Sequence, residues 1–77
     1  MYKQTTITPE GKTTTRTINS EVMISLLTQL HLLRQSGEDI EVVTNASEEN
    51  GWKYNRITVI RTNRRRGCTT TIFEEVK

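Results

Sequence analysis

The chain has 77 residues, a formal net charge of +2 at pH 7, one cysteine and one histidine. This length allows one domain, residues 1–77, with one modest hydrophobic core. A lone cysteine excludes an internal disulfide, and one Cys with one His cannot form a structural zinc site. No run approaches the roughly 20 apolar residues of a membrane span, so we expect a cytoplasmic protein with no membrane contact.

The chain begins with a predicted β-hairpin. Residues 2–8 and 12–18 are rich in threonine, which favours the pleated surface of a strand, and they flank Pro9-Glu10-Gly11. Proline early and glycine late suit a type I turn followed by a residue at positive φ. We expect Tyr2 and Ile18 to lie opposite each other at the open end of this hairpin.

An amphipathic helix is predicted over residues 20–35. Asn19 or Ser20 supplies an N-cap, and Gly37 is a suitable residue just beyond the C-terminus. The apolar side chains follow the i, i+3, i+4, i+7 spacing of one buried face. They are Val22, Met23, Leu26, Leu27, Leu30 and Leu33.

The second half of the chain predicts three more strands. Residues 39–44 read as a short strand, 45–51 as an acidic loop, and 52–62 with 68–76 as a final hairpin. The order is therefore β-β-α-β-β-β. We predict an α+β fold in which an antiparallel sheet of four or five strands packs on the one helix.

Side chains alternate along the final hairpin, so it has two faces. The face with more apolar area is assigned to the core; it carries Trp52, Tyr54, Arg56, Thr58, Ile60, Cys68, Thr70, Ile72, Glu74 and Val76. The other face presents an apolar patch of Ile57, Val59 and Phe73, which we predict to be an exposed association surface for a homodimer. The alternative is that the helix covers this patch. Trp52 and Tyr54 would then be exposed beside Arg56 as a platform for stacking bases.

Candidates for catalysis are sparse. His31 lies on the predicted helix, and no base accompanies Cys68 in the sequence. The chain also has no glycine-rich phosphate loop of recognised spacing. We predict no enzymatic activity, with no catalytic residue, no metal site and no cofactor.

Positive charge concentrates in the final hairpin, where Arg64, Arg65 and Arg66 follow one another between two strand-like runs. Guanidinium groups there can contact phosphate or carboxylate as planar forks. The predicted binding surface for nucleic-acid backbone or an acidic partner comprises Lys53, Arg56, Arg61, Arg64, Arg65 and Arg66. A third interpretation is a solvated turn whose charge keeps the hairpin from aggregating.

The sequence leaves two functions open. The first is a small non-enzymatic regulatory module that contacts nucleic acid through the arginine-rich hairpin. The second is a protein–protein inhibitor or adaptor that acts through the Ile57, Val59 and Phe73 patch and the charged loops. Chains of this size without catalytic residues often come from phages or mobile elements as accessory proteins.

Overall fold

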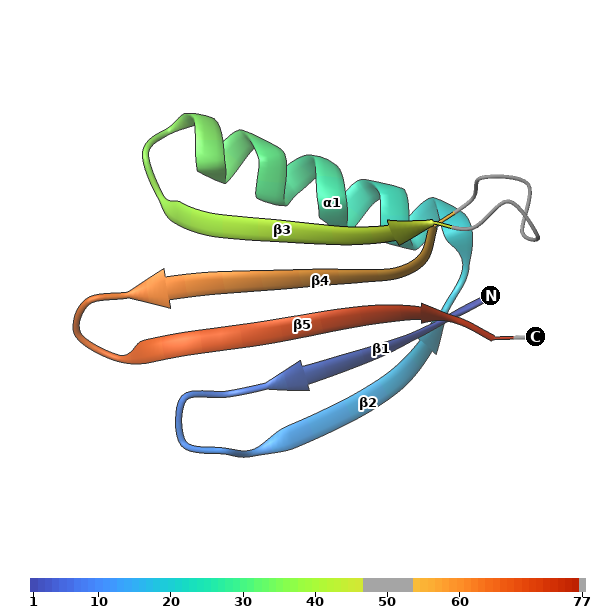
Figure 1. The fold of residues 1–77 in the computed structure, drawn as a ribbon, viewed down its shortest axis with the longest axis horizontal. Coiled ribbons are helices and arrows are strands. Elements are labelled where there is room, and N and C mark those ends of the chain that lie inside the picture. Colours follow the sequence, from blue (N-terminus) through green and yellow to red (C-terminus); the bar gives the residue numbers. More distant parts are fainter. Residues whose placement is uncertain (47–53, 77) are drawn as a thin grey trace.

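The computed structural model describes residues 1–46 and 54–76, and it has the predicted order of elements (Figure 1). They are β1 (Tyr2–Ile7), β2 (Thr13–Ile18), α1 (Ser20–Gln35), β3 (Asp39–Ala46), β4 (Tyr54–Asn63) and β5 (Gly67–Glu75). The strands form one five-stranded antiparallel sheet in the order β2-β1-β5-β4-β3. The α+β prediction is confirmed, with five strands rather than four.

The first hairpin has the turn that its sequence predicts. The Gly11 amide donates to the Thr8 carbonyl at 2.9 Å, and Gly11 has a φ of +87°. Tyr2 pairs with Ile18 at the open end, and both side chains are buried. β1 then pairs antiparallel with β5, which brings the first and last strands of the chain together in the middle of the sheet.

The helix begins and ends at the predicted signals. The Asn19 side chain accepts a hydrogen bond from the Val22 amide at 2.9 Å, which makes Asn19 the N-cap. At the other end the Gly37 amide donates to the Arg34 carbonyl and the Glu38 amide to the Leu33 carbonyl. With Gly37 at a φ of +102°, this is a Schellman motif, and it turns the chain directly into β3.

The hydrophobic core lies between α1 and one face of the sheet. Its buried members are Tyr2, Ile18, Met23, Ile40, Ile57, Val59 and Phe73. Four leucines of the helix pack against this group and stay only partly buried: Leu26, Leu27, Leu30 and Leu33. Met23 is therefore the one buried side chain that α1 contributes.

The prediction of which face of the final hairpin is buried is wrong. Ile57, Val59 and Phe73 are only 1–2% exposed beneath the helix, whereas Ile60 and Ile72 lie on the opposite, open face. The physical reason is that the whole sheet sets the buried face, whereas the prediction compared the two faces of one hairpin.

The pairing register supplies the apolar neighbours that this hairpin alone lacks. Val59 pairs with Val42 of β3, and Ile57 pairs with Phe73 across the hairpin. Directly paired residues share a face of the sheet, so these side chains all point toward α1. Tyr2 and Ile40 are buried on the same side, so the apolar surface under the helix spans several strands.

Candidate functional site

The two hairpin turns lie side by side at one end of the sheet, away from the chain termini (Figure 1). A Cβ atom placed on Gly67 would be 3.3 Å from the Pro9 Cβ atom, so the turns are in van der Waals contact. A hollow of about 390 Å³ lies at this contact. Its lining is mostly polar: Thr8, Pro9, Glu10, Arg61, Asn63, Arg66, Gly67 and Thr69.

The arginine turn has a defined backbone conformation. The Asn63 Oδ1 atom accepts hydrogen bonds from the amides of Arg65 at 2.9 Å and Arg66 at 3.3 Å. The Arg66 amide also donates to the Asn63 carbonyl at 3.2 Å, and Gly67 returns the chain to the strand at a φ of +95°. Such a turn followed by a residue at positive φ is a common hairpin connection, and here it holds three successive arginines outside the sheet.

The positively charged side chains of the three turn arginines are exposed to solvent. Arg64, Arg65 and Arg66 are all exposed, and no ion pair within residues 1–46 and 54–76 involves them. Lys12 follows the neighbouring turn and adds a fourth positive charge at this end, with Glu10 as the acidic residue of that turn. We call Lys12, Arg64, Arg65 and Arg66 the basic end.

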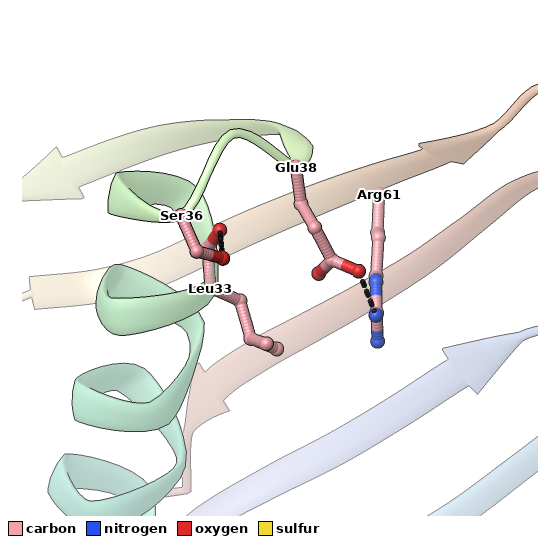
Figure 2. A network of polar contacts seen from close by, with 4 residues as sticks. All are labelled: Leu33, Ser36, Glu38 and Arg61. Carbon is pink, nitrogen blue, oxygen red and sulfur yellow. Dashed lines mark hydrogen bonds and ion pairs between the residues drawn. The ribbon is translucent and has the colours of Figure 1, made fainter.

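Arg61 lies next to the basic end but is held by a carboxylate. Its Nη2 atom is 2.7 Å from the Glu38 Oε1 atom, an ion pair between β4 and the turn that follows α1 (Figure 2). The two side chains are 46% and 38% exposed, so the pair contributes about 0–1 kcal/mol to stability. Nearby the Ser36 hydroxyl donates to the Leu33 carbonyl at 2.8 Å and closes the end of the helix.

The other predicted binding residues are not brought to this end. Arg56 is exposed near the opposite end of β4, seven residues from Asn63, which is about 23 Å along a strand. Lys53 lies outside the described residues. So do Trp52 and the side chain of Tyr54, on which the hypothesis of a base-stacking platform depends.

The predicted association patch is not available to a partner. Ile57, Val59 and Phe73 form the centre of the core, so the prediction that they are an exposed surface is wrong. What the sequence did not show is the placement of Lys12 and Glu38. Both flank turns, but only the β1–β5 pairing brings the turn before Lys12 to the same end of the sheet as the arginine turn, and only the helix end puts Glu38 beside Arg61.

Other kinds of site find no support in the part of the chain that the structure describes. No group of three or more His, Cys, Asp or Glu side chains there could hold a metal ion. No helix in that part is both long and apolar enough to cross a membrane. Comparison with protein families, with curated proteins and with solved structures found no match to this chain.

Proposed function

We propose that this chain is a small regulatory module that binds nucleic-acid backbone through its basic end. The observation that carries the proposal is the Asn63-ordered turn, which presents three exposed arginines without a carboxylate partner among the described residues. Guanidinium groups form charge-assisted, two-pronged hydrogen bonds with phosphate oxygens. Because the turn is already ordered, less conformational entropy is lost when it binds.

Phosphate suits this end better than a protein surface does. Protein interfaces have an apolar centre with a polar rim. The exposed large apolar side chains of the described residues belong to neither of the two turns: Met1, Val22, Ile24, Leu32, Val42, Val43 and Val76. The hollow between the turns is instead lined mainly by polar groups: the guanidinium groups of Arg61 and Arg66, hydroxyl and amide groups such as those of Thr8 and Asn63, and the one carboxylate of Glu10.

If the basic end contacts only the phosphate backbone and stacks on no base, its affinity for nucleic acid should depend on salt concentration and not on nucleotide sequence. If Lys12 and the three arginines each neutralise one phosphate of B-DNA, the slope of log K against log salt is about −3.6. Raising salt from about 50 to 200 mM then weakens binding about 150-fold. An aromatic platform would add a stacking contribution that salt does not weaken in this way.

Fluorescence anisotropy with labelled duplex DNA, duplex RNA and single-stranded DNA, each over a series of salt concentrations, tests the proposal. We expect Arg65→Gln to reduce the slope by about 0.9. Arg56→Gln makes the same change in charge far from the basic end, and it should leave the slope unaltered. Absence of binding to all three probes at low salt would refute the proposal, and so would an equal effect of the two variants.

A further inference from the structure

Among the described residues β3 is an edge strand of the sheet, and it carries exposed apolar side chains. Each edge strand presents unpaired backbone groups, and proteins usually protect such edges with charge, proline or short length. β2 has six residues, mostly threonine with Arg16, whereas β3 has eight, with its charged residues Asp39 and Glu41 confined to the first three positions. In its middle, Val42 is 39% and Val43 is 52% exposed. β3 is therefore the edge that favours pairing with another strand.

The flank of α1 that faces β3 is also incompletely covered. An apolar groove of about 260 Å³ separates the helix from β3, and Leu27, His31 and Val42 are among its lining residues. Ile24 precedes Leu27 by three residues and His31 by seven, so it lies on the same flank, and it is 59% exposed. The Val42 side of β3 and this flank of α1 thus form one continuous apolar strip, while Val43 is exposed on the opposite face of the same edge strand.

We infer that a second copy of this chain covers this strip, with β3 paired antiparallel to β3 of the second copy about a two-fold axis. The two five-stranded sheets then become one continuous sheet, and both helices lie on the same side of it. Each Ile24 flank faces the other helix across the axis. Self-association also adds buried apolar area to a chain whose own core has only seven buried side chains among the described residues.

The charge pattern of β3 fits a second copy. In an antiparallel pair, residues that lie directly opposite each other point to the same face of the sheet. With a two-fold axis normal to the sheet, the β3–β3 register must therefore be centred on one residue, which lies opposite its own copy. When Val42 or Val43 is the centre, Glu41 faces Val43 or Asn45 of the second copy, so no two carboxylates meet.

The helices add complementary charge. A two-fold axis makes them antiparallel, so the end that carries Arg34 lies beside the end of the second copy that carries Glu21. These side chains attract each other, and so do the opposite ends of the two helix dipoles. The basic end of each copy stays free, so this proposal does not depend on nucleic-acid binding.

Sedimentation velocity of the full chain, from low to high micromolar concentration, tests the inference. We expect the mass of two chains at high concentration, and we expect Val43→Lys to raise the dissociation constant at least about tenfold. The matched control is Val76→Lys, which places the same side chain at a site that is 48% exposed and remote from β3, and it should dissociate like the unmodified chain.

Ile24→Lys extends the test if Val43→Lys disturbs the strand, which circular dichroism would detect. Ile24 is exposed on the helix, so this change does not affect strand formation, and it should weaken the dimer as well. A one-chain mass of the unmodified protein at every concentration would overturn the inference and leave the edge to a strand of another protein. A dimer unaffected by both variants would also overturn it, because its interface would lie elsewhere.

Discussion

Replacing Asn63 by alanine tests whether one side chain orders the arginine turn. Asn63 Oδ1 accepts hydrogen bonds from two amides, at 2.9 and 3.3 Å, and both lie at an exposed site. Water replaces them in part, so we expect a loss of about 1 kcal/mol in unfolding free energy, similar to the loss of a helix cap. For a domain of this size that lowers Tm by about 4–8 °C.

The same variant distinguishes the contribution of turn order to nucleic-acid affinity from the contribution of arginine charge. Asn63→Ala leaves every arginine in place, so affinity should fall up to about fivefold while the salt slope stays constant. Asn63→Asp retains an acceptor at the same position and adds a negative charge, so stability should be retained while the slope becomes shallower by up to about 1.

Thermal unfolding followed by circular dichroism, together with anisotropy titrations, gives both quantities. An unchanged Tm for Asn63→Ala would refute the role of Asn63 in the turn. A slope that falls in Asn63→Ala would refute the separation of order from charge.

Two further predictions concern stability, measured by urea unfolding. Gly67→Ala and Gly11→Ala both place a side chain at positive φ, at a cost of about 1–2 kcal/mol each. Gly67→Ala should cost more, because only its Cβ atom meets the neighbouring turn, and equal costs would contradict that contact. Phe73→Ala should cost about 3–5 kcal/mol, whereas Ile72→Ala on the open face should cost about 1 kcal/mol. The reverse order would show that the wrong face has been assigned to the core.

Local signals in the sequence predict the individual elements well. Asn19 caps the helix, Gly37 follows its end, and the Pro9 turn joins the first two strands where they were expected. In each case a few neighbouring residues supply the physical cause, namely a side-chain acceptor or a backbone able to adopt positive φ. Such causes can be read from a short stretch of sequence.

The buried face of the final hairpin could not be predicted in this way. Both of its faces carry β-branched residues, and the choice depends on which strands flank it and in which register. Only the β3–β4 pairing places Val42 beside Val59, and only the sheet as a whole puts Tyr2 under the helix. These contacts join residues that are far apart in the chain, so alternation within one hairpin does not reveal them.

The sequence predicted the arginine turn of the candidate site but not the contacts that surround this turn. The arginine turn is a local feature, and its exposure follows from its position between two strands. The contact of this turn with Pro9 and the ion pair of Arg61 with Glu38 both depend on tertiary structure. They change the expected surface, because Arg61 is paired with a carboxylate and the first turn of the chain lies against the arginine turn.

The most direct test of the basic end compares two triple variants with equal charge. Arg64→Gln/Arg65→Gln/Arg66→Gln and Lys3→Gln/Arg16→Gln/Arg56→Gln each change the formal net charge from +2 to −1, since +2 − 3 = −1. Duplex DNA binding near 0.1 M salt, where charges more than about 10 Å apart are largely screened, reports on their position. We predict that the turn variant loses binding and that the control stays within about threefold of the unmodified chain. Equal losses in the two variants would contradict a binding site at the basic end.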